Sequence, residues 1–135
     1  MYYLDSDVIF NAITLQDEVK NKVANELVID ALKNDLFVIS TLVIQEIGYG
    51  LARYEVESSI IRDELIYWNM LNVKAINKTD ITRAINLAQQ IGYKHINDCI
   101  HTALAESLHC DRFYTYNKSD YKRIQKHTDL QIIIL

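Results

Sequence analysis

The sequence predicts an α/β protein, a three-layer α/β/α sandwich around a central, mostly parallel sheet of about five strands. Short apolar runs alternate with longer segments of helical periodicity, which is typical of a sheet covered by helices on both faces. The chain has 135 residues, 50% hydrophobic and 24% charged, as expected for one ordinary globular domain. Proline is absent and only three glycines occur, so no linker divides the chain and we expect a single domain over residues 1–135.

Five short segments rich in β-branched and aromatic residues are expected to form the strands. They are Tyr2–Leu4, Leu36–Ile39, Asn72–Ile76, Arg112–Tyr114 and Gln131–Ile134. Because helical patterns separate these runs, we expect the strands to pair in parallel.

Helical segments lie between the strands. From Val19 to Leu32, apolar residues recur at i, i+4 and i+8 with polar residues opposite them. Ser40 or Thr41 can cap a helix that continues to about Tyr54. The other helices are expected at roughly Glu57–Leu71, Thr79–Ile91, Asn97–Leu108 with Asn97 as N-cap, and near Lys122–Lys126.

Charge is distributed unevenly along the chain, although the net charge is only -4. The first 70 residues carry 12 acids and 5 bases, whereas residues 71–135 carry 6 acids and 9 bases. A net acidic chain is unlike proteins that coat polyanions, because those are usually basic overall. The late basic residues form either a solvated helix face or a patch that contacts phosphates. Candidate phosphate contacts are Lys118, Lys122 and Arg123.

The sequence predicts a cytoplasmic protein with no membrane partner. No basic region precedes an apolar run in Met1–Asp5, as a secretory signal would require. The longest apolar stretch, Leu36–Ile44, is far shorter than the ~20 residues of a membrane span. Cys99 and Cys110 form no C-x-x-C motif, so we expect reduced thiols.

Acidic residues stand where a parallel sheet presents its ligand-binding edge, beyond the carboxyl ends of the strands. They are Asp5, Glu46 and Asp120, each within a few residues of a predicted strand, and Asp98 in the first turn of a helix. Converging carboxylates repel one another strongly unless a divalent cation neutralises them. Since the set offers oxygen ligands without paired cysteine or histidine, it suits Mg²⁺ or Mn²⁺ better than zinc.

Each of these residues also has a purely structural reading. Asp5 can cap a helix after a strand-to-helix turn, and Asp98 can complement a helix dipole. Glu46 can be an uninvolved exposed residue, and Thr115–Tyr121 an ordinary polar loop. His101 is expected to be a surface or hydrogen-bonded residue rather than a metal ligand.

Taken in order, these motifs resemble those of the PIN domain family. The matching segments are Tyr3-Leu4-Asp5-Ser6-Asp7, Ser40-Thr41 with Glu46, Asn97 to Ala105, and Phe113 to Tyr121. The resemblance covers nearly the whole chain, and within the family it is strongest to small, stand-alone VapC-type toxin ribonucleases. It implies an α/β/α fold in which clustered acids bind Mg²⁺ or Mn²⁺. It also implies an enzyme that cleaves single-stranded RNA.

Carried over residue by residue, the resemblance makes Asp5, Glu46 and Asp98 the first three acids of the site. The identity of the fourth acid stays open. Many members have aspartate where this chain has Asn117, whereas in others the last acid of a T-x-N-x-x-D segment, here Asp120, fills the site. The resemblance implies that Asp5 and Asp98 bind the ion directly and that Glu46 and Asp120 act mainly through water.

Further roles follow from the same resemblance. Side chains expected to orient the ligands are Ser6, Thr115 and Asn117. The expected reaction is metal-dependent hydrolysis of the phosphodiester bond with water as the nucleophile. Toxins of this kind usually form homodimers and are held inactive by an antitoxin at the acidic site, so the expected partners are single-stranded RNA, an antitoxin and a second copy of the chain.

Two other functions stay open at this point. A catalytically weak or inactive PIN-like interaction module would explain Asn117, although such a module has no need of three acids at strand ends. A haloacid-dehalogenase-type phosphatase would explain Asp5-x-Asp7 and a hydroxyl at Ser40 or Thr41, although the segment after Tyr114 lacks that family's adjacent acids.

Overall fold

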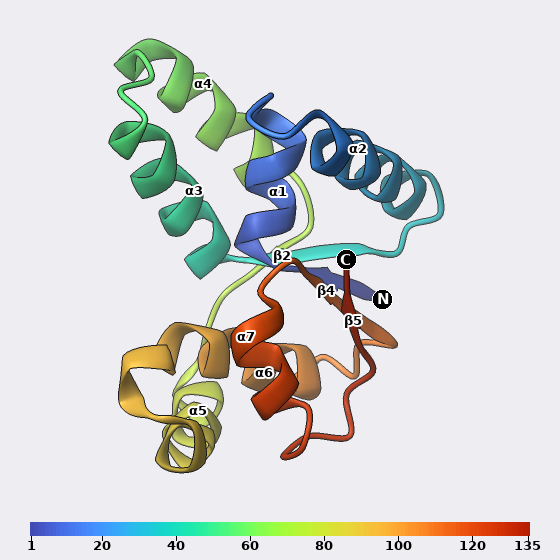
Figure 1. The fold of residues 1–135 in the computed structure, drawn as a ribbon, viewed down its shortest axis with the longest axis vertical. Coiled ribbons are helices and arrows are strands. Elements are labelled where there is room, and N and C mark those ends of the chain that lie inside the picture. The colour runs from blue at the N-terminus through green and yellow to red at the C-terminus, as the bar shows by residue number, and fades with distance from the viewer.

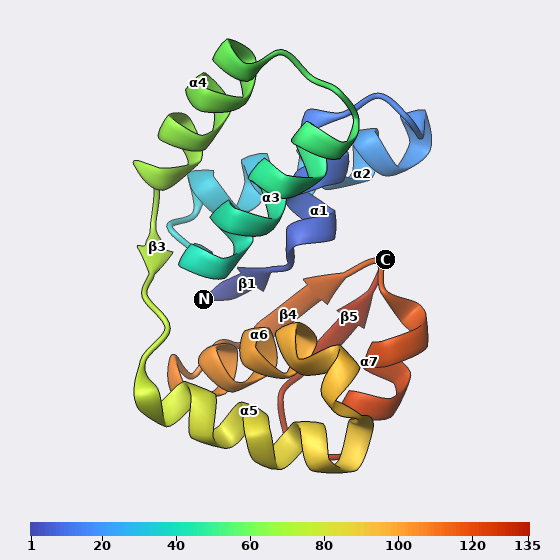
Figure 2. The ribbon, with the colours of Figure 1, turned by 90° about the vertical axis from the view of Figure 1, so that its left-hand side faces the viewer.

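A five-stranded parallel sheet forms the middle layer of the computed structural model, which describes residues 1–135. The strands are β1 Tyr2–Leu4, β2 Phe37–Ser40, β3 Val73–Lys74, β4 Arg112–Thr115 and β5 Ile132–Ile134. They lie in the order β3-β2-β1-β4-β5, and every neighbouring pair is parallel. Helices α1–α4 cover one face of the sheet and α5–α7 the other (Figure 1, Figure 2). The predicted fold class is therefore confirmed.

The helices begin where side chains can satisfy their first backbone N–H groups. Their bounds are α1 Ser6–Ile13, α2 Glu18–Lys33, α3 Thr41–Arg53, α4 Ser58–Asn69, α5 Lys78–Ile91, α6 Ile96–Ser107 and α7 Lys118–Ile124, with a 3-10 turn, η1, at Tyr93–His95. Ser40 caps α3 by accepting from the Val43 backbone N–H. Asn77 and Asp80 form a reciprocal capping box at α5. No helix is both long and apolar enough to cross a membrane.

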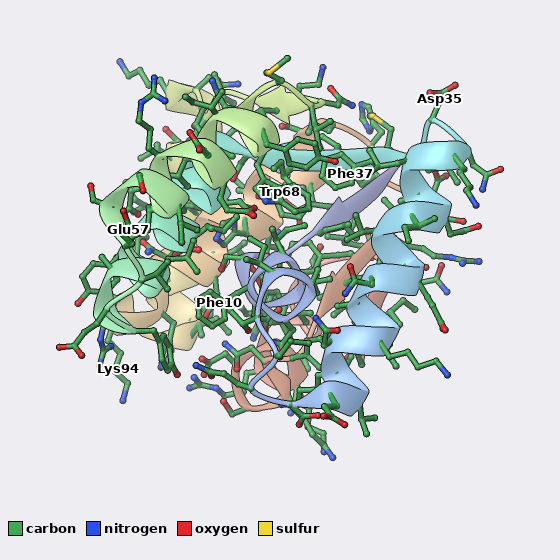
Figure 3. The ribbon with its side chains drawn as sticks, turned by 90° about the horizontal axis from the view of Figure 1, so that it is seen from above. Phe10, Asp35, Phe37, Glu57, Trp68 and Lys94 are labelled. Atoms are coloured by element: carbon green, nitrogen blue, oxygen red, sulfur yellow. The ribbon has the colours of Figure 1, made fainter.

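The core lies on both faces of the two central strands. Tyr3 and Leu4 of β1 and Phe113 of β4 are completely buried, and the rings of Tyr3 and Phe113 stack with centroids 5.0 Å apart. Above β2, Phe37 stacks on Trp68 of α4 with centroids 6.2 Å apart (Figure 3). Burial of this apolar surface fixes β1 and β4 side by side at the centre of the sheet.

Several element boundaries differ from the sequence-based expectation. Helix α1 was not predicted, α7 begins at Lys118 rather than near Lys122, and β3 is only two residues long. Helix α6 begins at Ile96 with His95 as its N-cap residue, because η1 already turns the chain into the helix. Asn97, the predicted cap, instead lies inside the first turn.

Candidate active site

Neighbouring strands bring the first acid to the carboxyl edge of the sheet. Leu4 of β1 pairs in register with Tyr114 of β4, so the residues that follow them meet. The Thr115 hydroxyl donates to Asp5 Oδ2 at 2.9 Å, while the Ser6 backbone N–H donates to Asp5 Oδ1 at 2.8 Å. Both readings of Asp5 are therefore compatible, because one oxygen caps α1 and the other faces β4.

A second carboxylate, that of Asp7, lies two residues after Asp5 in the first turn of α1. Asp7 Oδ2 accepts from the Tyr116 backbone N–H at 2.9 Å and lies 3.1 Å from the Thr115 hydroxyl. Asp7 Oδ1 is buried and has no hydrogen-bond partner. A buried acceptor without a partner costs free energy in the folded state. The Asp7 Oδ1 oxygen is therefore available to bind a further group at the site, which would remove that cost.

A buried histidine joins the first acid to Glu46 of α3. His101 Nε2 lies 2.9 Å from Glu46 Oε2 and 3.7 Å from Asp5 Oδ1. On its other side, His101 Nδ1 is 2.7 Å from the Tyr3 hydroxyl, and Asn97 donates to Glu46 Oε1 at 2.8 Å. His101 is hydrogen-bonded, as expected, but it is also an integral part of the acidic cluster, which the sequence analysis missed.

The other two predicted acids form a second group. Asn117 Nδ2 lies 3.4 Å from Asp98 Oδ2 and donates to Asp120 Oδ2 at 3.0 Å. Asp120 also pairs with His95 Nδ1 at 3.2 Å and with Arg123 Nη2 at 2.9 Å. His95, Asp98 and Asp120 together offer ligand atoms close enough to hold one ion. His95 is the second member that the sequence analysis missed.

The two groups are connected. The Asn117 backbone N–H donates at 2.9 Å to the Thr115 hydroxyl that also contacts Asp5. The negative charge of Asp5 raises the pKa of Asp98, after the larger effect of burial. The structure thus brings all four predicted acids into one network at the sheet edge, while their catalytic roles stay a prediction.

Burial dominates the electrostatics of the acids nearest the sheet. It raises the pKa of Asp5, and it raises the pKa of Asp98 to about 8. At Glu46 burial acts in the same direction, but the hydrogen bond and charge of His101 overcome it and lower the pKa. For His101, burial alone would lower the pKa, yet the hydrogen bond to Glu46 and the charge of Asp5 raise it.

Asp120 behaves differently from Asp98. Burial works to raise the Asp120 pKa, but hydrogen bonds from Asn117 and Arg123 outweigh burial and lower it. Asp120 is therefore the charged member of the second group, whereas Asp98 is held largely protonated without a cation nearby.

The donor set fits a hard divalent cation. Asp5 is buried and Asp98 is half-buried, burial raises the pKa of both carboxyl groups, and Asp7 Oδ1 has no hydrogen-bond partner. A bound cation would offset the electrostatic repulsion between such carboxylates and favour their ionised forms. Oxygen ligands at this density are those that Mg²⁺ and Mn²⁺ prefer. The residues present thus fit either ion, and the prediction that Asp5 and Asp98 bind it directly stays a prediction.

The predicted phosphate contacts lie on α7, beside the second group. Lys118 and Lys122 are exposed. The Arg123 guanidinium already donates to Asp120 and to the Ile91 carbonyl, so part of its hydrogen-bonding capacity is engaged within the fold.

Ser6, which was expected to orient a metal ligand, has its hydroxyl 3.5 Å from Asp5 Oδ1.

We expect the stability of the metal-free protein to fall as the pH rises from about 5 to about 8. Burial first, and the charge of Asp5 second, raise the pKa of Asp7 from 3.8 to about 7 and that of Asp98 to about 8. Between the low pKa of the unfolded chain and these raised values, the folded state holds protons that the unfolded state has lost, so rising pH favours unfolding. The raised pKa of His101 acts in the same direction.

Thermal unfolding in EDTA and in Mn²⁺ across this range measures the effect. Because a bound cation keeps the carboxylates ionised, Mn²⁺ should remove most of the decline. A melting temperature that climbs steadily with pH in EDTA would contradict the assigned protonation states.

Comparison with known proteins identifies the family. A family model described as the PIN domain matches residues 2–127. No curated protein sequence matches the chain significantly.

Solved structures give the same fold. A chain of VapBC2 from Rickettsia felis, bound to a DNA fragment from its promoter, is similar at a TM-score of 0.72 and 20% identity, over 99% of this chain and 98% of that one. A chain of VapBC-1 from nontypeable Haemophilus influenzae gives 0.70 and 23% over 98% and 96%. A toxin-antitoxin complex from Klebsiella pneumoniae gives 0.63 and 19% over 90% of each chain. Because the family model spans nearly all of the sequence, the chain belongs to the PIN domain family.

Proposed function

We propose that this protein is a divalent-metal-dependent endoribonuclease that hydrolyses phosphodiester bonds in single-stranded RNA and is the toxin of a toxin-antitoxin pair. The observation that carries the proposal is the joining of buried Asp5 and half-buried Asp98 in one hydrogen-bonded network at the carboxyl edge of the sheet. Membership of the PIN domain family supports it.

A bound Mg²⁺ or Mn²⁺ ion would lower the pKa of the attacking water and stabilise the negative charge that develops on the phosphoryl oxygens. Asp5 and Asp98 would hold the ion. Thr115 and the Ser6 backbone N–H orient the Asp5 carboxylate, and Asn117 orients Asp98. Fixed ligands of this kind keep the site in its productive geometry.

The remaining acids would position water around the ion. Glu46 is held by His101 and Asn97, and Asp120 by His95 and Arg123. Their low pKa values keep both ionised near neutral pH, so each can accept a hydrogen bond from water. Attack by water breaks a P–O bond of the RNA without a covalent enzyme intermediate and without the 2′-hydroxyl.

The partners are proposed from the assemblies in which the similar structures occur. The structures similar to this chain include the VapBC2 and VapBC-1 chains and the toxin-antitoxin complex described above. We expect an antitoxin to cover the acidic site and the chain to form a homodimer. Lys118 and Lys122, exposed on α7, would contact phosphates of the RNA.

An inactive interaction module is the second candidate, favoured by one observation. The Asn117 amide lies between Asp98 and Asp120 and donates to Asp120. An amide there offsets the repulsion between the two acids without a cation.

Cleavage of an unstructured RNA by the purified full chain separates the candidates. A nuclease should cut the RNA in Mg²⁺ or Mn²⁺ and stop in EDTA, and the same preparation of Asp5→Asn, which removes a proposed direct ligand, should not cut and so excludes a contaminant. Folded protein that leaves RNA intact in both metals would support the module instead. Release of phosphate from an aryl phosphate would point to the phosphatase reading.

A further inference from the structure

A cleft of about 470 Å³ opens beside the acidic network, between α1 and α3. Its floor shares Ser6, Asp7 and Glu46 with the candidate active site. A volume of this size is in the ordinary range for sites that hold small organic groups. The cleft is therefore a direct extension of the site and not a separate surface.

Two helical faces form its walls. On α1 the ring of Phe10 lines the cleft one turn beyond Ser6 and Asp7. It approaches α3 so closely that a Cβ atom at Gly50 would lie 3.0 Å from the ring, and the side-chain view places Phe10 on α1 (Figure 3). Gly50 thus allows the two helices to keep this spacing.

The α3 wall carries aromatic side chains that face solvent. Tyr49 is 62% exposed and Tyr54 is 58% exposed. The Tyr54 and Phe10 rings lie with centroids 5.5 Å apart and are tilted by 39°, so together they form a ledge. Because α3 rises ~1.5 Å per residue, Tyr49 lies about one turn beyond Glu46, and Tyr54, at the end of the helix, lies about 12 Å beyond Glu46 along the helix axis.

Arg53 is the single cation in the lining of this cleft. Of the five arginines, the other four donate side-chain hydrogen bonds, to Asp63, Glu106, Tyr114 and Asp120. Arg53 takes part in no salt bridge, and its guanidinium lies 5.9 Å from the Tyr49 ring centroid. A guanidinium with free donors next to exposed rings is suited to a phosphate.

We propose that the cleft is a nucleotide subsite of the enzyme, in which a base flanking the scissile phosphate stacks on Tyr54 and Phe10 while Arg53 binds a neighbouring phosphate. This proposal rests on the proposed ribonuclease function and adds the residues that hold the substrate strand. Stacking on aromatic rings together with backbone contacts is how single strands are bound without base-specific reading.

Continuity with the acidic site and the unpaired Arg53 favour RNA over a protein segment in the cleft. A strand whose phosphate reaches Asp5 can continue past Glu46, where the next turns of α3 supply Tyr49, then Arg53 and Tyr54. On the other side of the network, α7 supplies Lys118 and Lys122. The strand would therefore lie across the acids with a cationic group at each end.

The test measures binding and cleavage of a fluorescein-labelled, unstructured RNA of about twelve nucleotides by the full chain. Tyr54→Ala should raise KM about tenfold with little change in kcat, because stacking is lost equally from the ground and transition states. Tyr54→Phe keeps the ring and should behave like the wild type. Tyr67→Ala, which removes a tyrosine of similar exposure from α4, is the matched control and should leave KM unchanged.

Arg53 is tested through salt dependence, in an Asp98→Asn background that cannot cleave. The slope of log affinity against log salt should become shallower by about 0.7 in Arg53→Ala, as expected for one lost phosphate contact to a single strand. Arg53→Lys should restore the slope, and Tyr54→Ala should not alter it. Arg62→Ala on α4 is the control that leaves both slope and affinity unchanged.

The results separate the subsite from the proposed function. If the wild type shows no metal-dependent cleavage of RNA, the ribonuclease function itself is wrong. If the wild type cleaves, but Tyr54→Ala and Arg53→Ala keep wild-type KM, affinity and salt slope, only the subsite is wrong and the cleft has another occupant, such as a segment of a partner protein. Melting temperatures of the variants verify that each is folded.

Discussion

Replacement of Asp98 by asparagine should reduce Mg²⁺- or Mn²⁺-dependent RNA cleavage by about 10³-fold or more while the protein stays folded. Loss of a direct carboxylate ligand weakens metal binding and removes several kcal/mol of stabilisation from the transition state. The fold should not suffer, because burial already raises the pKa of Asp98 to about 8, and asparagine resembles the protonated acid in shape and charge.

Rates of RNA cleavage at saturating Mn²⁺, with melting curves of both proteins, measure this effect. Asp63→Asn is the matched control, since Asp63 is an exposed acid on α4 that pairs with the neighbouring Arg62 and takes no part in the acidic network. Equal cleavage by Asp98→Asn and the wild type, with contaminating nuclease excluded, would refute the role assigned to Asp98.

Asp120→Asn should cost about 100-fold in cleavage, far more than Asn117→Ala, if Asp120 supplies the fourth acid. The physical reason is that a cation in a site short of one carboxylate gains more from a charged oxygen than from an amide dipole. The lowered pKa of Asp120 keeps it charged: burial opposes this, but the hydrogen bonds from Asn117 and Arg123 prevail. Asn117→Asp should be tolerated and should tighten metal binding, because it adds an anionic ligand beside the same ion.

Calorimetric titration of Mn²⁺ into the three variants, paired with cleavage rates, decides between these roles. Asn117 also caps α7, so Asn117→Ala is expected to lose about 1 kcal/mol of stability, and rates must be compared well below its melting temperature. If Asp120→Asn binds Mn²⁺ and cleaves RNA like the wild type, the site operates with three acids.

The strands could be predicted because burial on both faces leaves a strong local pattern. β1, β2 and β4 are short apolar runs whose central residues are fully buried. The sequence indicated Asp5 as a possible helix cap, which the structure confirms, but helix α1 itself was not predicted because its eight residues follow directly on Asp5, within a polar motif that also suggested a ligand site. β3 was predicted too long because its two paired residues border an irregular segment that reads equally well as strand.

The acids could be predicted from the sequence because residues that follow parallel strands lie at the ligand-binding edge of the sheet. The histidines that contact these acids could not be predicted. His101 is recruited by the Tyr3 hydroxyl from β1 and by Glu46 from α3, and His95 meets Asp120 from α7. Each contact joins segments far apart in the chain, so it depends on how α6 packs and not on any local pattern. The one local signal was the position of His101, one turn after Asp98 on the same helix.

The strand order has a consequence for synthesis of the chain. β1 lies at the centre of the sheet, yet its partner β4 is made more than a hundred residues later. Until Arg112–Thr115 leave the ribosome, one edge of β1, which carries the apolar Tyr3 and Leu4, has no partner strand, and such an edge can pair with other chains. Asp5 lacks Thr115 during the same interval, so an unfinished chain is exposed to aggregation before it can acquire a complete site.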